Sequence, residues 1–446
     1  MADWRVAREE MVARVRGRGG IGEEVAGALR AVPRHLFLPG VPPETAYRDE
    51  AIVTRRDAEG RPVSSSSQPT IMAVMLEQLG MEPGHRVLEV GAGTGYNAAL
   101  LAYLAGPGGR VTSVDIDPDL VGRARGHLAE AGFTGVEVVC GDGAEGFAPG
   151  APYDRVIATV GVWDLFPAWL EQLAPGGRIV APVDLNGVQR SVALERADGR
   201  WTSRSAVACG FMRLRGPFAG PEVLRPLDPE SELMISLPRA RKTGDVLAAL
   251  GGPAAELPSG VDAGPAALAD GFGLWLAAHE PRWCLLSESR PRWLTAGAAG
   301  GPGFTMVMGI VEDGGLCLLH PREAPAPPVV RAFGSGGAVL AADLLAHLRA
   351  WDAAGRPSTP GLRVDVHPGN GHPGSDGNLG DGVQAGNGMQ AGDGVLSGGD
   401  GRPPGVGARS RAGDDDGSGT APGDGLVIRK RHTTFVLSWP AARGRT

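Results

Sequence analysis

The residues best suited to chemistry lie in one glycine-rich stretch, V-L-E-V-G-A-G-T-G-Y, from Val87 to Tyr96. Three glycines spaced two apart, Gly91, Gly93 and Gly95, follow a short apolar run, and helical spacing of apolar residues resumes after them. This pattern predicts a strand, a tight turn and a helix. Glycine suits such a turn because it adopts backbone angles that side chains forbid and leaves bare backbone for a ligand. We expect that ligand to be a nucleoside.

Three acidic residues accompany the glycines at the ends of successive predicted strands. Glu89 precedes Gly91 in the order E-x-G-x-G-x-G, which resembles the first motif of class I S-adenosylmethionine methyltransferases. In those enzymes this carboxylate and the glycine backbone hold the methionine part of the cofactor. Asp115 ends the next predicted strand and is placed to accept hydrogen bonds from two ribose hydroxyls. Asp142 follows the third strand and is placed to take the adenine amino group.

A run of serines precedes this region, Ser64-Ser65-Ser66-Ser67-Gln68-Pro69, directly before a helix predicted over about Thr70 to Leu79. Serine runs are often flexible linkers. This run, however, ends at a helix N-terminus, where hydroxyls and exposed amides together can bind an anion. We therefore expect a carboxylate of the substrate to dock there.

Several further motifs occur in one order along the chain: V-P-R-H-L-F-L-P, A-Y-R-D-E-A, S-S-S-Q-P, the glycine stretch, P-Y-D-R-V-I-A-T-V and L-A-P-G-G-R-I-V-A-P-V. Over about residues 20 to 215 the sequence resembles the protein-L-isoaspartate O-methyltransferase family. The family's active-site serine, in T-I-S-Q-P, falls on Ser67. Ser65 and Ser66 precede it and, with Gln68, are expected to contact the substrate. The resemblance implies methyl transfer from S-adenosylmethionine to an isoaspartyl carboxylate, followed by closure of the ester to a succinimide.

The chemistry agrees with the residue types. A carboxylate with an ordinary pKa near roughly 3.9 is already a nucleophile at neutral pH, so no general base is required. The enzyme must instead align the carboxylate oxygen with the methyl group and sulfur. Ser67 would act as a hydrogen-bond donor, and no metal is expected. His35 and His85 form no ligand pattern, so we expect them to be structural.

Charge, cysteine spacing and apolar content limit the classes of partner and the location to expect. The net charge of −7, without a block of Lys or Arg, argues against nucleic acid or an acidic membrane as the main partner and favours a peptide or small-molecule substrate. The four cysteines are far apart and lack redox or metal spacing, which favours buried small side chains. The charged N-terminus and the lack of a long apolar run predict a cytoplasmic location.

The length of 446 residues and the 42% hydrophobic content predict two domains with real cores. The expected fold class is α/β, a Rossmann-like doubly wound sheet with an N-terminal helical cap and a C-terminal α+β domain. The expected boundaries are a cap and substrate loop at 1–80, the methyltransferase domain at 81–215, a linker at 216–240, and the C-terminal domain at 241–440. A stretch rich in Gly and Asp, at about 368–425, is predicted to be a disordered insertion.

Two features depart from the minimal family pattern: a longer, charged loop from Thr54 to Ser64, and the large C-terminal half. They leave an alternative open, a dedicated aspartate methyltransferase of a ribosomal peptide pathway of lanthipeptide or ATP-grasp type. A further alternative, of another class, is a non-catalytic peptide-binding module that retains the cofactor fold. The intact acids and Ser67 argue against that module. The sequence leaves the oligomeric state undetermined.

Overall fold

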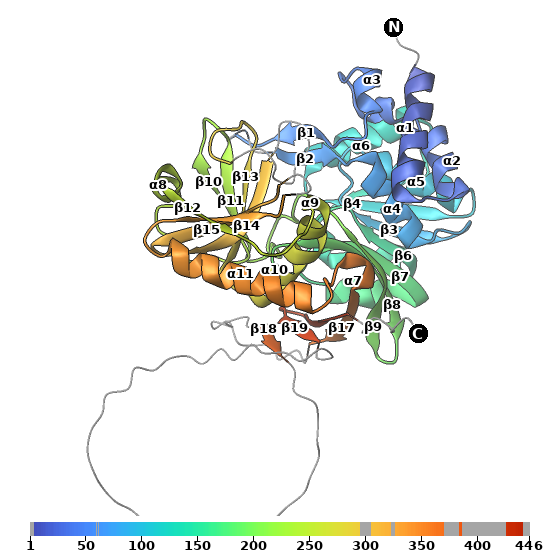
Figure 1. The fold of residues 1–446 in the computed structure, drawn as a ribbon. Coiled ribbons are helices and arrows are strands. Elements are labelled where there is room, and N and C mark those ends of the chain that lie inside the picture. The colour runs from blue at the N-terminus through green and yellow to red at the C-terminus, as the bar shows by residue number, and fades with distance from the viewer. Residues whose placement is uncertain are drawn as a thin grey trace, which may run out of the picture.

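The structure is a computed structural model and describes residues 4–58, 60, 62–294, 305–322, 326–369, 383–385 and 425–439. The predicted Gly/Asp-rich insertion lies almost entirely outside these residues. Figure 1 shows two sheets, each with its own helices, lying side by side.

The larger sheet has eleven strands, in the order β18-β19-β20-β17-β9-β8-β7-β6-β3-β4-β5. Its parallel part carries the glycine stretch and the acids, and it is followed by the antiparallel β8 and β9. The predicted α/β class is confirmed. The strands are β3 (Arg86–Val90), β4 (Arg110–Asp115), β5 (Glu137–Cys140), β6 (Tyr153–Ala158), β7 (Leu173–Asp184), β8 (Gln189–Ala197) and β9 (Arg200–Ala208).

Both faces of the parallel part are buried, which explains its nearly continuous apolar strands. In β3, Val87 packs into one core, together with the N-terminal helices, whereas Leu88 packs into the other core. The helices on the first face are α1 (Trp4–Gly19), α2 (Glu23–Ala31), α4 (Pro69–Leu79), α5 (Tyr96–Ala105) and α6 (Pro118–Glu130), and α7 (Pro167–Gln172) packs on the second face. The predicted N-terminal helical cap begins with α1 and α2.

A small hairpin, β1 (Ile52–Arg56) and β2 (Pro62–Ser66), lies beside the glycine stretch and carries most of the serine run. It follows two short helical segments, η1 (Arg34–Phe37) and α3 (Pro43–Ala46). The serine run is thus a paired strand rather than a flexible linker. Pro69 at the first turn then starts α4, and Gly80, in a left-handed conformation, ends it.

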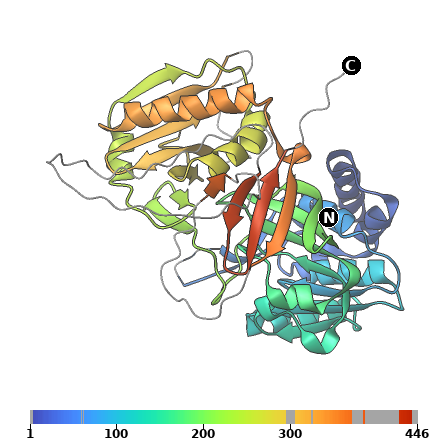
Figure 2. The same ribbon diagram turned by 90° about the horizontal axis from the view of Figure 1, so that it is seen from below.

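The expected boundary of 241–440 assigned the last strands to the C-terminal domain. In the structure they belong to the large sheet instead. β17 (Arg363–Pro368) pairs with β9, and β20 (Thr433–Ser438) and β19 (Leu426–Arg429) follow it at the edge of the large sheet, with β18 (Val383–Ala385) outermost. Figure 2 shows these strands, in orange and red, between the two halves of the protein. The physical reason is burial: Val364, Val366, Phe435 and Leu437 complete the core that begins with Leu88.

The second sheet has seven antiparallel strands, in the order β10-β11-β13-β14-β15-β16-β12. They are β10 (Val223–Asp228), β11 (Leu233–Leu237), β12 (Ala254–Pro258), β13 (Trp283–Glu288), β14 (Thr305–Glu312), β15 (Gly315–His320) and β16 (Val329–Phe333). The expected linker at 216–240 therefore contains two strands. Pro226 is compatible with a strand here because β10 is an edge strand, where proline is tolerated.

Helices cover both faces of this second sheet. α11 (Gly337–Ala353) and α10 (Gly273–His279) pack on one face, and α8 (Val246–Gly251) packs on the other (Figure 1). The shorter segments are α9 (Pro265–Ala267), η4 (Leu268–Phe272) and η5 (Thr359–Gly361). β14 and β15 are consecutive in the chain and form an antiparallel hairpin.

The two sheets meet at a tightly packed junction. Arg190 of β8 is buried and donates to the hydroxyl of Thr359 at 2.7 Å and to the carbonyl of Asp270 at 2.8 Å. Gly187, in the turn before β8, has a φ of 93°, and a Cβ there would lie 2.6 Å from the ring of Trp283. These contacts join the seven-stranded domain directly to the methyltransferase sheet.

Within the described residues, no helix is long and apolar enough to cross a membrane. The same part of the chain contains no group of three or more His, Cys, Asp or Glu side chains arranged to hold a metal ion.

Candidate active site

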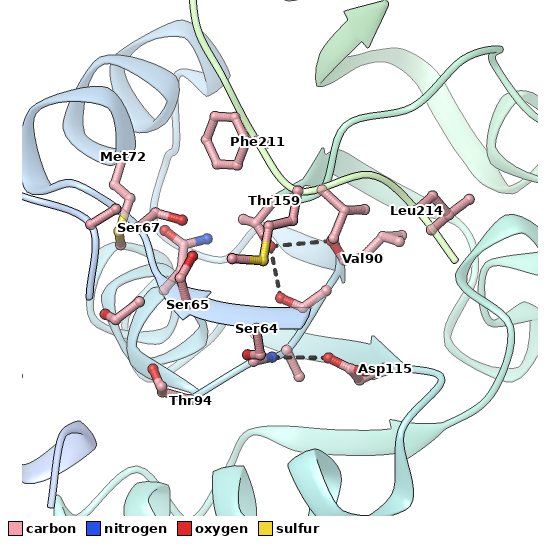
Figure 3. A pocket seen from close by; sticks show the side chains of 18 of the residues that line it. Ser64, Ser65, Ser67, Met72, Val90, Thr94, Asp115, Thr159, Phe211 and Leu214 are labelled. Carbon is pink, nitrogen blue, oxygen red and sulfur yellow. Dashed lines mark hydrogen bonds between the residues drawn. The ribbon is translucent and has the colours of Figure 1, made fainter. Parts of the chain in front are cut away.

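A cavity of about 380 Å³ lies at the carboxyl ends of the parallel strands, where ligands bind in open α/β sheets. Three parts of the chain enclose it: the glycine stretch, the serine strand β2 with the start of α4, and the segment from Ala208 to Arg215. Figure 3 shows Ser65 and Ser67 on one side and Asp115 on another, and it also labels Phe211 and Thr159, which line the same cavity.

The glycine stretch approaches its neighbours closely. Gly91 has a φ of 102°, and a Cβ there would lie 2.8 Å from the Oγ1 of Thr159, which donates to the Gly91 carbonyl at 2.7 Å. Gly91 and Gly93 both line the cavity. Gly95 does not: a Cβ there would lie 3.3 Å from the Ala124 carbonyl of α6. Its place is a close approach between helices rather than ligand contact.

Asp115 lines the cavity at the end of β4, with 8% of its surface exposed. Its Oδ2 accepts from the Gly93 backbone N–H at 3.0 Å, and its Oδ1 accepts from the Asp117 N–H at 3.1 Å (Figure 3). A carboxylate oxygen accepts more than one hydrogen bond. Asp115 can therefore hold the glycine loop and also accept from hydroxyls of a ligand.

Glu89 differs from the expectation, because it does not line the cavity. It is fully buried behind the glycine loop, where it accepts from Asn97 Nδ2 at 2.8 Å and from the hydroxyl of Ser113. Burial raises the pKa of Glu89 to about 7, and these two hydrogen bonds oppose that rise only in part. Its carboxyl group thus supports the start of α5, and contact with a cofactor stays a prediction.

Asp142 lies beside the cavity rather than among its lining residues, which include the neighbouring Gly143. Its Oδ1 accepts from the Ala144 N–H at 2.9 Å and caps the short segment η2 (Gly143–Glu145). The structure therefore gives Asp142 a local capping role, and contact with an adenine amino group stays a prediction.

All four serines of the run and Gln68 line the cavity. The carbonyl of Ser65 faces the glycine loop: a Cβ on Gly93 would lie 3.9 Å from it. Ser66 is 4% exposed, and its hydroxyl has no hydrogen-bond partner among the described residues. The fold therefore brings Ser65, Ser66, Ser67 and Gln68 into the same cavity as Gly91, Gly93 and Asp115.

The expected anion site at the start of α4 is already occupied by the chain itself. Asp49 accepts from the Thr70 N–H at 2.9 Å and from the Thr70 hydroxyl at 2.8 Å, and Arg18 lies 3.0 Å from it. Gln68 Nε2 donates to the carbonyl of Asp49 at 3.1 Å. Thr70 and Gln68 at this helix terminus are therefore engaged with Asp49, and docking of a substrate carboxylate at the serine run stays a prediction.

Sequence reasoning missed the wall formed by residues 208–215. Gln189 holds it: its Oε1 accepts from the Phe211 N–H at 2.7 Å, and its Nε2 donates to the Phe211 carbonyl at 3.1 Å. Gly161 adds two backbone hydrogen bonds, to Met212 and from Leu214, both at 2.8 Å. The available signal was the end of the family resemblance, which reaches 215.

Cys209 also belongs to this wall, and burial raises the pKa of its thiol to about 12. It is half-buried and protonated at neutral pH, as expected of a small packing side chain.

Asp117 contacts arginines from two separate segments beside the cavity. Arg55 of β1 donates to its Oδ1 at 2.6 Å, and Arg215 lies 3.6 Å from its Oδ2. Despite partial burial, the Arg55 contact holds the pKa of Asp117 below its usual value. The charged loop after Thr54 and the segment ending at Arg215 thus meet at one carboxylate, two residues beyond Asp115.

The chain matches the family model described as "Protein-L-isoaspartate(D-aspartate) O-methyltransferase (PCMT)" over residues 6–217. It is 43% identical over 212 residues to the protein-L-isoaspartate O-methyltransferase of Methanoculleus marisnigri, covering 47% of this chain and 92% of that protein. The protein of the same name from Methanopyrus kandleri is 41% identical over 216 residues, covering 48% of this chain and 93% of that protein.

A solved structure named protein-L-isoaspartate O-methyltransferase aligns with 80% of this chain and 96% of its own, at 24% identity and a TM-score of 0.46. The sequence matches end near residue 217, so the seven-stranded domain lies beyond them. They nevertheless span more than nine tenths of two relatives at above 40% identity. The chain therefore belongs to the protein-L-isoaspartate O-methyltransferase family.

Proposed function

We propose that this protein is an S-adenosylmethionine-dependent carboxyl O-methyltransferase that acts on isoaspartyl residues of proteins or peptides. Family membership gives the reaction class. The observation that carries the proposal is that the serine strand, the glycine loop and Asp115 line one shared cavity of about 380 Å³. A cofactor and an acceptor bound there would lie next to each other.

The residues present fit the cofactor. Gly91 and Gly93 leave bare backbone at the cavity floor, where a Cβ on Gly91 would meet Thr159 and Val160. Asp115 offers carboxylate oxygens at the adjoining strand end, in the position suited to ribose hydroxyls. When bound, S-adenosylmethionine supplies an electrophilic methyl group.

The chain's own contribution is orientation. The acceptor carboxylate is ionised at neutral pH, so no side chain needs to remove a proton from it. The Ser67 hydroxyl is proposed to donate a hydrogen bond to one carboxylate oxygen, which leaves the other free to attack, and Ser65, Ser66 and Gln68 complete this side. Phe211 and Met72 add apolar side chains to the lining of the same cavity (Figure 3). Holding the two reactants in line is the main source of rate enhancement.

The direct test is methyl transfer to a short isoaspartyl peptide, with the matching aspartyl peptide as the control. We expect methyl ester to form on the isoaspartyl peptide, followed by succinimide as the ester closes. Incorporation into neither peptide, by a protein that binds S-adenosylhomocysteine, would contradict the function.

Replacing Ser67 by alanine is expected to lower methyl transfer by about 10²-fold, because a misplaced acceptor loses the near-attack geometry. Cofactor affinity should stay within about twofold of wild type, because that side of the cavity is unchanged. Radiolabelled methyl transfer and calorimetry measure the two quantities. Ser205→Ala on β9, whose hydroxyl accepts from Gln78 away from the cavity, is the control. Full activity of Ser67→Ala would place the acceptor elsewhere.

Replacing Asp115 by alanine is expected to weaken cofactor binding by about 1.5–3 kcal/mol, as for lost charge-assisted hydrogen bonds. We expect a loss near the upper end of this range, because the Asp115 carboxylate also accepts a hydrogen bond from the Gly93 N–H and so fixes the glycine loop. Titration calorimetry with S-adenosylhomocysteine measures the change, and Asp352→Ala on α11 is the control. Unchanged affinity would remove Asp115 from the site.

We further propose a protein or peptide partner, with no nucleic acid or membrane component, and a cytoplasmic location. The net charge of −7 without a basic block supports the partner class. No observation favours the dedicated peptide-pathway enzyme or the non-catalytic module, whereas both named relatives carry the isoaspartate activity in their names.

A further inference from the structure

Arg34 lies in the V-P-R-H-L-F-L-P motif and is fully buried in η1. Its guanidinium group donates to three backbone carbonyls. Nε donates to Ala46 at 2.8 Å, and Nη2 donates to Ser67 at 2.9 Å and to Ser66 at 3.4 Å. The last two carbonyls belong to the serine run that lines the active-site cavity, at the end of β2 and just after it.

Burial of this arginine is costly, because a charge without a close opposite charge loses its hydration. Within the described part of the chain, no ion pair involves Arg34, and burial lowers the pKa of its guanidinium. The nearby carboxylate of Asp49 is engaged with Thr70 and Arg18. Burying an arginine merely to fill space would gain less than an apolar side chain would, so its contacts are informative.

The guanidinium also packs on the cofactor side of the cavity. The central carbon of the guanidinium lies 5.0 Å from the ring centroid of Tyr96, which is the last residue of the glycine stretch and the first residue of α5. Tyr96 and Ser67 both line the cavity. One planar group thus touches the element that carries the glycine loop and the element that carries Ser67.

We propose that Arg34 is a positioning residue that fixes the serine strand, and with it Ser67, relative to the glycine loop. This inference rests on the proposed role of Ser67 in holding the acceptor. Arg34 lies behind the strand and does not contact the acceptor. It acts by keeping the Ser66 and Ser67 carbonyls in one plane, so that the hydroxyl of Ser67 points at a fixed place.

The planar fork of arginine is essential to this role. Lysine would keep the positive charge but has a single nitrogen on a flexible stem, so it cannot reach Ala46 and Ser67 with the same geometry. Arg34→Lys should therefore separate charge from position.

We expect Arg34→Lys to lower kcat for an isoaspartyl peptide by about tenfold or more, because small displacements at a reacting centre are costly. The Kd for S-adenosylhomocysteine should stay within about twofold of wild type, which also reports that the variant is folded. The matched control is Arg155→Lys. Arg155 likewise donates to backbone carbonyls, of Leu79 at 2.8 Å and Gly80 at 2.9 Å, but at the far end of α4. It should lose stability without losing turnover.

A double-mutant cycle tests whether Arg34 acts through Ser67. In a Ser67→Ala background, Arg34→Lys should change kcat by less than about twofold, because the hydroxyl that it positions is gone. An equal fold-loss in both backgrounds would overturn the proposal. Added guanidinium ion should restore part of the turnover of Arg34→Ala but none of that of Ser67→Ala.

Amide hydrogen exchange separates this inference from the proposed function. Exchange in the segment from Ser64 to Gln68 should accelerate in Arg34→Lys and not in Arg155→Lys. If wild type failed to methylate isoaspartyl peptides, the proposed function would fall, while the exchange result would still decide whether Arg34 holds Ser67. Unchanged exchange in Arg34→Lys overturns the inference.

Discussion

Ending the chain at Arg215 is expected to abolish cooperative folding, although the family match ends at residue 217. Such a chain would keep the glycine loop and Ser67 but lose β17, β19 and β20 from the edge of β9. Trp201, Leu88 and Val192 would lose the apolar side chains of those strands that complete their core. An exposed edge beside an open core is also a template for aggregation.

Polar contacts make this loss larger. The Lys430 ammonium donates to the carbonyls of Trp163 and Asp184, and its charge opposes the rise in the pKa of Asp184 that burial causes. Asp164, which is 2% exposed, accepts from the His432 N–H at 2.6 Å and from the Thr433 hydroxyl. Truncation would remove all of these donors and leave two buried aspartates behind.

Circular dichroism melting of the full chain and of residues 1–215 measures the effect. Truncation removes many contacts at once and can cause aggregation. Lys430→Met in the full chain therefore tests the contribution of one contact. Lys430→Met leaves the carbonyls of Trp163 and Asp184 without this donor, at a cost of about 1–3 kcal/mol for each unsatisfied group. Asp184→Asn in the same chain should recover the part that comes from the lost positive charge. A truncated chain that melts like wild type and binds cofactor equally would show that the C-terminal strands are accessory.

The cofactor side was predictable because its signals are local. The glycines need particular backbone angles, and strand-end acids must meet at one edge of a parallel sheet, so Gly91, Gly93 and Asp115 could be placed from spacing alone. The same reasoning did not reveal that Glu89 is buried behind the loop, because spacing does not show which side of a loop a carboxyl group faces. Only the packing of Asn97 and Ser113 shows that it is turned inward.

The acceptor side was less predictable because its contacts are distant in sequence. Asp49 accepts from the Thr70 N–H at the start of α4, 21 residues away in sequence. Gln189 accepts from the Phe211 N–H, 22 residues away. The strand pairing of Val366 with Trp201 spans most of the second domain, and no local pattern separates an edge strand of one sheet from that of another.

The buried carboxyl of Glu89 gives the second large expected effect, a pH dependence of stability. Burial raises its pKa to about 7 in the folded protein from the model-compound value of 4.5. The folded state therefore binds this proton more tightly than the unfolded chain does. The contribution of Glu89 to the free energy of unfolding is most favourable below about pH 4.5 and falls as the pH rises to about 7. The total change is about 3 kcal/mol.

Glu89→Gln should remove this dependence while keeping the packing. The glutamine oxygen can accept from Asn97, and its amide can donate to the Ser113 hydroxyl, so both polar neighbours stay paired. Relative to wild type, the variant should gain about 3 kcal/mol of unfolding free energy between pH 5 and pH 8. Urea unfolding at several pH values measures this gain. Glu82→Gln, at a side chain that is 74% exposed, is the control and should leave the pH profile unchanged. Parallel profiles for wild type and Glu89→Gln would mean that the buried carboxyl ionises as readily as an exposed one, and that burial at this position is not what sets its charge.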